Sequence, residues 1–260
     1  MDLLEGEIDM EGLFDNPDSM AMGDMSCVDF DQDGKPITIP KPLTPFEELH
    51  CAEYDKFLVP IFKEKDDAES FNGNGVVVDN YLISAAHVAN SKKCKKPLPY
   101  LYFLFEGRLE KVDDSMIIHD GRGGEGELVP DKDGIHDDLI VYKLEKKYNS
   151  FKLSEKKAEK DMVLMMKPYK FNNGIVANNQ TFDCEVVRRY AKEQENSTEY
   201  WTNCCTIHIL LGSEKGDSGS ALFRGETLYG ILIRGAIWGN NGRQYDMLDA
   251  AYINKIIKKK

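Results

Sequence analysis

The chain has 260 residues, of which 42% are hydrophobic and 30% are charged, a composition that is ordinary for a globular protein. Its net charge of −12 comes mostly from residues 1–36, which hold eleven acidic residues and one lysine, so the remainder is nearly neutral. This distribution excludes an extended basic face for nucleic acid, and the sequence has no run of about 18 apolar residues that could cross a membrane. We therefore expect no nucleic-acid partner and no membrane partner.

Residues 1–45 mix acidic residues, methionines and prolines, and this composition predicts a disordered acidic leader. The amino terminus lacks the positively charged and continuous apolar regions of a secretory signal, which favours an intracellular protein. Apolar residues between Leu3 and Phe14 could form a short docking helix, although a solvated tail is the simpler interpretation. Residues 1–36 could therefore bind a partner or act as an autoinhibitory segment.

Two patterns resemble metal or disulfide sites. The run DFDQDG at residues 29–34 opens like a calcium-binding loop, but Pro40 stands where a bidentate glutamate is needed. Cysteines occur without a Cys-x-x-Cys pair or a regular framework, at positions 27, 51, 94, 184, 204 and 205. The sequence therefore predicts free thiols and no metal site.

From residue 57 onward, short β-branched and aromatic runs alternate with Gly, Asn and Asp, which is typical of strands and turns. One pair of runs, GVVV and YLIS, is separated by Asp79 and Asn80 alone and predicts a hairpin. The runs lie at residues 57–62, 75–84, 100–105, 115–119, 139–144, 162–166, 182–187, 206–211, 221–223 and 228–233. Because amphipathic helices do not separate them, they predict an all-β sandwich or a pair of barrels.

Two other segments complete the predicted elements. The charged stretch SEKKAEKD at residues 154–161 suits a linker between two halves of the chain. The C-terminal segment AAYINKIIKKK places Ile253, Ile256 and Ile257 at helical spacing and predicts a helix.

The stretch EKGDSGSALF, residues 214–223, is a turn of small residues followed by an apolar strand. A serine hydroxyl is a weak nucleophile near neutral pH, so it needs a base, a group that orients the base, and donors for an oxyanion. Glycine at position 216 permits a turn in which the amides of Gly216 and Ser218 point to one spot. The small Gly219 and Ser220 leave room for a substrate carbonyl.

His87 is the candidate base among five histidines, because YLISAAHVAN places it after an apolar strand and two small alanines. A histidine in that position can face a cleft, although on its own a histidine after an apolar strand is more often a structural residue. Asp138 begins the apolar run LIVYKL and is the candidate orienting acid, since a buried carboxylate needs a partner such as an imidazole N–H. By alternation, we expect Asp137 to face solvent.

The segments SAAHV, DDLIVYKL and GDSGSALF, in this order, resemble the chymotrypsin-like (trypsin-fold) serine peptidases, whose chain order is His, Asp, Ser. The resemblance covers roughly residues 55–258. It implies an all-β fold of two six-stranded antiparallel β-barrels with a C-terminal helix. In this interpretation a peptidase domain at 46–260 follows the leader, with its N-terminal barrel at about 55–150 and its C-terminal barrel at about 160–250.

The resemblance implies a serine endopeptidase that hydrolyses polypeptide substrates through an acyl-enzyme. His87 would be the general base, Asp138 would hold its ring, Ser218 would be the nucleophile, and the amides of Gly216 and Ser218 would bind the oxyanion. No metal or organic cofactor enters this chemistry. A catalytically silent scaffold or regulatory binding protein is the alternative, and an esterase-like or self-cleaving protein that removes its own leader is a third.

The chain departs from the secreted members of that family in two ways. Val88 and Glu214 stand where those members carry cysteines, which favours a reducing compartment or a non-animal branch of the family. The region before His87 also lacks the Ile-Val-Gly-Gly sequence whose cleaved amino terminus pairs with the aspartate before the serine, here Asp217. Either an internal Lys, Arg or backbone group holds Asp217, or the site forms only when something binds. We expect maturation without that cleavage.

The resemblance also places the specificity pocket. Its floor would lie near Gly212 and Ser213, and one wall would include Arg234 and Gly235. A carboxylate is missing from the expected floor, so we expect no preference for Arg or Lys at the cleaved position. Arg234 could instead attract an acidic side chain, although a surface arginine in a strand is the simpler interpretation.

Overall fold

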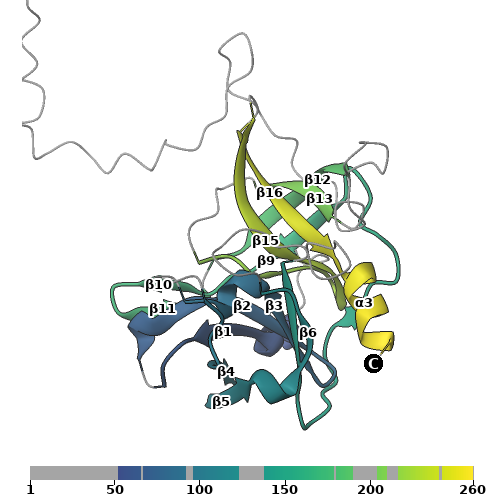
Figure 1. Ribbon diagram of the computed structural model, residues 1–260. Coiled ribbons are helices and arrows are strands. Elements are labelled where there is room, and N and C mark those ends of the chain that lie inside the picture. The colour runs from purple at the N-terminus through teal and green to yellow at the C-terminus, as the bar shows by residue number, and fades with distance from the viewer. Residues whose placement is uncertain are drawn as a thin grey trace, which may run out of the picture. The chain divides into compact units, whose positions relative to one another are not determined.

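The computed structural model describes residues 52–65, 67–91, 96–122, 138–178, 180–189, 204–209, 216–239 and 242–259 (Figure 1). The predicted leader at residues 1–45 lies outside these ranges, and the domain boundaries expected from the sequence stay predictions. The described residues form two seven-stranded β-sheets, one two-stranded sheet, four short 3-10 helices and one C-terminal α-helix, so the predicted all-β class is confirmed.

The N-terminal sheet has seven strands in the order β5-β4-β1-β2-β3-β7-β6, all paired antiparallel. They are β1 (Leu58–Phe62), β2 (Phe71–Val78), β3 (Tyr81–Ala85), β4 (Tyr100–Phe105), β5 (Arg108–Asp113), β6 (Ile117–Asp120) and β7 (Leu139–Lys143). The predicted hairpin is present, with Val78 opposite Tyr81 and Asp79 at a positive φ of 54° that aspartate tolerates in turns.

This first sheet differs from the expected six-stranded barrel. The edge strands β5 and β6 are consecutive in the chain and are joined by the short 3-10 helix η4 (Asp114–Met116). The chain therefore passes through η4 from β5 at one edge of the sheet to β6 at the other edge. The sheet is therefore a half-barrel whose two edges are joined through η4.

The C-terminal sheet is a closed six-stranded barrel, as predicted. Its order is β14-β9-β12-β13-β16-β15, and a pairing between β14 and β15 closes it. The strands are β9 (Val163–Met166), β12 (Phe182–Arg189), β13 (Cys204–Ile209), β14 (Ala221–Arg224), β15 (Thr227–Gly239) and β16 (Gly242–Asp249). Strand β8 (Lys152–Leu153) adds to β15 in parallel. Closure leaves the barrel strands without exposed edges.

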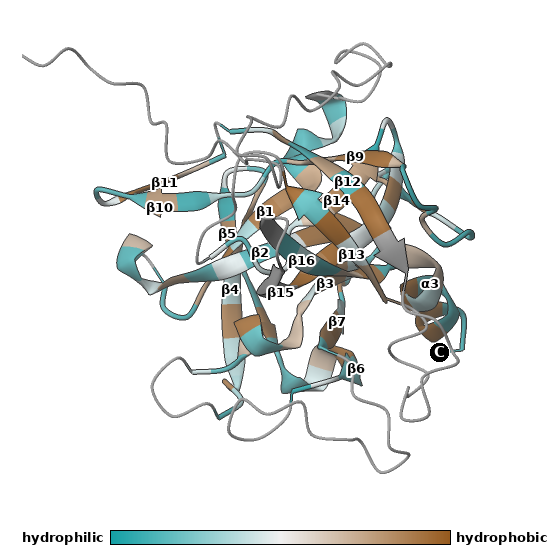
Figure 2. Cartoon of the chain, turned by 90° about the horizontal axis from the view of Figure 1, so that it is seen from above, coloured by the Kyte–Doolittle hydropathy of each residue, from teal (hydrophilic) through white to brown (hydrophobic). Residues whose placement is uncertain are grey.

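Alternating apolar residues fill the C-terminal barrel, because successive side chains of a strand point to opposite faces. On β12, Phe182, Cys184 and Val186 are buried in this core, and Ile207 and Ile209 join them from β13. In Figure 2 the strands β9, β12 and β13 carry apolar colouring.

A C-terminal helix and a charged connecting segment accompany the two large sheets. Helix α3 (Ala250–Lys258) is the predicted C-terminal helix and buries Ile253. At nine residues it is the longest helix within the described ranges, and none there is long and apolar enough to cross a membrane. The charged stretch 154–161 joins β8 to β9 without a helix or strand, and its Ala158 is fully buried.

A small hairpin that the apolar runs do not predict is formed by β10 (Lys170–Asn172) and β11 (Ile175–Ala177). Asn173 and Gly174 form its turn with φ angles of 51° and 81°, the backbone that an Asn-Gly pair favours. The hairpin lies beside β1 in Figure 1 and leaves Ile175 67% exposed.

Candidate active site

His87 and Asp138, predicted to act together, are in contact. His87 lies in the 3-10 helix η3 (Ala86–Ala89), directly after β3. Its ring Nδ1 is 2.6 Å from Asp138 Oδ2, and its backbone N–H donates to Asp138 Oδ1 at 2.8 Å. An ionised carboxylate can only accept hydrogen bonds, so Nδ1 is the donor in this pair. The neutral ring then carries its proton acceptor on Nε2.

The pairing of β3 with β7 brings these two residues together across 51 positions of the chain. Ala85 lies opposite Leu139 in this antiparallel pair, and Ala86 N–H continues the ladder by donating to Asp138 O at 3.0 Å. The small alanines let the chain turn into η3 at this point. The His87 side chain stays 46% exposed while Asp138 is only 11% exposed, so the ring faces outward on a buried carboxylate.

Ser218 lies in the turn before β14, which we call the serine turn and define as residues Gly216–Gly219. Gly216 and Gly219 have φ angles of 108° and 83°, a region that favours glycine. A Cβ at Gly219 would lie 2.0 Å from Asn74 O and 2.5 Å from Ser84 Oγ. Glycine is therefore required at position 219 by space as well as by backbone conformation.

The serine turn and η3 both lie against strand β2. Asn74 of β2 donates its backbone N–H to Ser218 O at 2.8 Å. A Cβ at Gly73 would lie 3.0 Å from Ser218 O and 2.7 Å from Val88 Cγ2. Because Val88 follows His87 directly, the missing side chain of Gly73 lets the serine turn and η3 come close together.

The predicted pocket residues are only partly described. Gly212, Ser213 and Glu214 lie outside the described residues. Arg234 and Gly235 lie in β15, where the backbone of Arg234 is opposite that of Asp246 in the antiparallel register with β16. The role of these residues in substrate choice stays a prediction.

Asp217 has a lysine beside it. Lys170 Nζ on β10 lies 3.8 Å from Asp217 Oδ2, and the two side chains are 10% and 1% exposed. The same ammonium lies 4.9 Å from the centre of the Phe182 ring. The sequence left open an internal Lys, Arg or backbone partner for Asp217, and Lys170 is such a partner.

Sequence reasoning missed Asn74, whose side chain is bound on both sides. Its Nδ2 donates to Gly216 O at 2.7 Å and to Tyr169 O at 3.2 Å, and its Oδ1 accepts from Tyr169 N–H at 2.7 Å. A polar residue in the strand FNGNGVVV was the available signal, because a buried amide in a strand needs hydrogen-bond partners.

The described cysteines do not offer a competing nucleophile. Cys184, Cys204 and Cys205 are buried free thiols, as predicted, while Cys27, Cys51 and Cys94 lie outside the described residues. Burial raises the pKa of the Cys184 thiol well above its ordinary value, and the charges of Asp183 and Asp217 raise it further. Within the described ranges, His, Cys, Asp and Glu side chains form no group of three that could hold a metal ion.

Comparison with known proteins gives structural matches alone. No protein-family model matches the chain, and no curated protein matches its sequence. Neuropsin, a serine protease expressed in the limbic system of mouse brain, matches with a TM-score of 0.55 at 14% identity, over 82% of this chain and 97% of neuropsin.

Two further solved structures are similar. The active form of the Rv3671c protease from M. tuberculosis matches with a TM-score of 0.53 at 12% identity, over 85% of this chain and 93% of that protease. A scabies mite inactivated protease paralogue matches with a TM-score of 0.53 at 14% identity, over 82% of this chain and 94% of the paralogue. At such identities the likeness is one of fold. The chain therefore has the chymotrypsin-like fold of the trypsin-like serine proteases.

Proposed function

We propose that the protein is a serine endopeptidase in which Ser218 is the nucleophile, His87 the general base and Asp138 the group that orients His87. The observation that carries the proposal is the double contact of Asp138 with the backbone and the ring of His87. It fixes the ring in the tautomer whose Nε2 can take a proton.

The proposed reaction has two steps of the same kind. Ser218 Oγ attacks the carbonyl carbon of the scissile peptide bond while His87 Nε2 takes its proton. The amides of Gly216 and Ser218 stabilise the oxyanion, and Asp138 stabilises the imidazolium. His87 then protonates the leaving amine, which gives the acyl-enzyme. Water, activated by His87, hydrolyses the ester and restores the Ser218 hydroxyl.

Labelling with a fluorophosphonate probe tests this proposal, because the probe bonds covalently to an activated serine. We expect the parent chain to be labelled at Ser218 and the Ser218→Ala variant not to be labelled. Ser115→Ala is the matched control, since Ser115 is an exposed serine in η4. Circular dichroism of each variant separates loss of the reaction from loss of folding.

A catalytically silent scaffold or regulator is the second candidate. It is favoured by the similarity to a scabies mite inactivated protease paralogue, a chain of this fold that is described as inactivated. Folded parent protein that neither reacts with the probe nor hydrolyses a protein substrate would support this candidate against the first.

The substrate and the leader carry smaller proposals. We expect a peptide library to show no dominance of Arg or Lys at the cleaved position, and such dominance would contradict the pocket assignment. An inhibitory role for residues 1–36 predicts that a chain starting near residue 46 cleaves substrate faster than the full chain. Equal rates would remove that role. Self-cleavage predicts that Ser218→Ala keeps a leader that the parent chain removes.

A further inference from the structure

We infer that Asn74 and Lys170 are positioning residues that hold the serine turn from within the chain, so that the proposed active site needs no newly cut amino terminus. This inference rests on the proposed function. We call the two residues, together with Tyr169 and Asp217, the internal clamp.

Asn74 holds the serine turn at two points. Its side-chain Nδ2 donates to Gly216 O at 2.7 Å, and its backbone N–H donates to Ser218 O at 2.8 Å. The two carbonyls flank Asp217. Because glycine at position 216 gives the backbone rotational freedom, these bonds restrict a segment that would otherwise sample several conformations. Both amides assigned to the oxyanion lie in this segment.

Asn74 also fixes the start of the β10–β11 hairpin. Its Oδ1 accepts from Tyr169 N–H at 2.7 Å while Nδ2 donates to Tyr169 O at 3.2 Å. Asn74 is only 2% exposed, so water does not reach its side-chain amide. The bonds to the protein therefore satisfy donors and acceptors that would otherwise be buried without partners. Lys170 follows Tyr169 directly, and its position is therefore tied to Asn74.

Lys170 completes the clamp through charge. Its Nζ lies 3.8 Å from Asp217 Oδ2 in a site where both side chains are nearly inaccessible to solvent. A buried carboxylate is costly unless a positive or donating group lies nearby. The ring of Phe182 supports the ammonium through a cation–π contact at 4.9 Å. Lys170 thus supplies a positive charge to the residue between Gly216 and Ser218.

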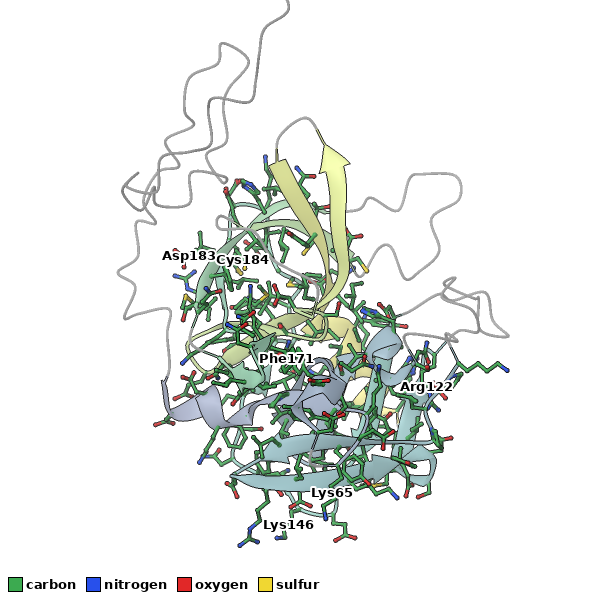
Figure 3. The ribbon with its side chains drawn as sticks, turned by 90° about the vertical axis from the view of Figure 1, so that its left-hand side faces the viewer. Lys65, Arg122, Lys146, Phe171, Asp183 and Cys184 are labelled. Atoms are coloured by element: carbon green, nitrogen blue, oxygen red, sulfur yellow. The ribbon has the colours of Figure 1, made fainter. Side chains whose placement is uncertain are left out.

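The clamp connects the two sheets. Asn74 belongs to β2 of the N-terminal sheet, and Lys170 of the hairpin contacts Phe182 on β12 of the C-terminal barrel. Figure 3 labels Phe171, the residue after Lys170, at the level where the barrel meets the N-terminal sheet. Since η3 with His87 packs on β2 through Val88 and Gly73, the clamp holds the serine turn in register with His87.

The test is a double-mutant cycle of Lys170→Met and Asp217→Asn, with Lys170→Arg as the conservative variant. We expect Lys170→Met to lower kcat and the rate of probe labelling by about 100-fold, the loss that a small misplacement of a site group causes, with a smaller change in KM. Lys170→Arg keeps most of the rate. The double variant labels faster than Lys170→Met, because it also removes the buried carboxylate charge that Lys170 neutralises in the parent. Lys152→Met, which removes an exposed ion pair with Glu226, leaves the rate unchanged.

A Lys170→Met variant that labels at the parent rate would overturn the inference, and so would a double variant whose losses simply add. The unfolding free energies of the parent, the two single variants Lys170→Met and Asp217→Asn, and the double variant form a second cycle. This second cycle does not depend on activity. If the parent chain is folded but never labelled, the proposed function fails, while the clamp still predicts coupling between Lys170 and Asp217 in that second cycle. Should Lys170→Met not fold, Asn74→Ala carries the test: amide exchange at Tyr169 must accelerate and labelling must slow.

Discussion

Asp138 contacts His87 at two points, with Oδ1 on the backbone N–H at 2.8 Å and Oδ2 on the ring Nδ1 at 2.6 Å. A carboxylate that binds only the ring would fix the orientation of the ring but not its position relative to the backbone. Here the second contact ties the carboxylate to the chain that carries the ring. Asp138 therefore sets both the tautomer of His87 and the position of η3.

Replacing Asp138 by Asn separates these two roles. The Asn oxygen can still accept from the His87 backbone N–H, which places its NH₂ group against Nδ1. The ring proton is then forced onto Nε2, so His87 cannot accept the proton of Ser218. We expect kcat to fall by about 10⁴-fold with little change in thermal stability. Kinetics together with a melting curve check this, and an unchanged kcat would show that Asp138 does not orient the base.

Gly219→Ala tests the packing of the serine turn on Asn74 and Ser84. The added Cβ would lie 2.0 Å from Asn74 O, a backbone atom that cannot move aside alone, and the φ of 83° adds strain. We expect the free energy of unfolding in urea to fall by about 3 kcal/mol or more. Gly174→Ala is the matched control, since its φ is 81° and nothing lies within 4 Å of its Cβ position. It should lose only the conformational cost of about 1–2 kcal/mol.

If both glycine variants lost equal stability, backbone conformation alone would explain Gly219, and the close approach of Asn74 to the serine turn would be wrong. The same pair of variants also separates folding from reaction. Gly174→Ala should be labelled by the probe at the parent rate, because Gly174 lies in the turn of the β10–β11 hairpin and not in the serine turn.

Apolar runs predict most of the strands, and the strands that they miss have physical reasons. Strand β5 lies at a sheet edge and exposes charged residues, so its sequence RLEKVD has no apolar run. Strand β16 buries Asp246 and Asp249, whose charges interrupt the pattern. Strands β10 and β11 have three residues each, too few for a period to be visible.

The site divides in the same way. Motifs around His87, Asp138 and the serine turn are local, so the sequence shows them. The bonds of Asn74 to Tyr169 and Gly216 span 95 and 142 positions of the chain. Pairing across such distances depends on how two sheets pack, and a single sequence carries no direct record of it. The expected lysine or arginine beside Asp217 could be anticipated as a kind of group, while its identity as Lys170 needed the fold.

Asp183 on β12 should reduce stability at neutral pH. Burial raises the pKa of its carboxyl above the ordinary 3.8, and its Oδ1 is buried without a hydrogen-bond partner in the described structure. A group whose folded pKa is raised stabilises the fold below its unfolded pKa and loses that contribution as pH rises through the folded pKa. We expect Asp183→Asn to unfold at a higher temperature than the parent at pH 7, with the difference shrinking toward pH 4.

Asp113 provides a control of opposite sign. Hydrogen bonds from the Ser115 hydroxyl and backbone N–H lower the pKa of this exposed carboxyl. Its contribution is present above the unfolded pKa and is lost as pH falls through the folded pKa. Asp113→Asn should therefore unfold at a slightly lower temperature than the parent at pH 7. A gain for Asp113→Asn, or a loss for Asp183→Asn, would contradict the assigned environments.

Cys184 offers a last test, because a reactive thiol near the serine turn would compete with Ser218 as the nucleophile. The side chain is fully buried in the C-terminal barrel, and burial raises the pKa of its thiol, with further increase from the charges of Asp183 and Asp217. The thiolate is the reactive form, so we expect iodoacetamide to leave Cys184 unmodified in the folded protein and to modify it in urea. Mass spectrometry of peptides containing Cys184 measures this. Rapid native alkylation of Cys184, together with loss of probe labelling, would mean that the barrel opens beside the serine turn and that the assigned burial is wrong.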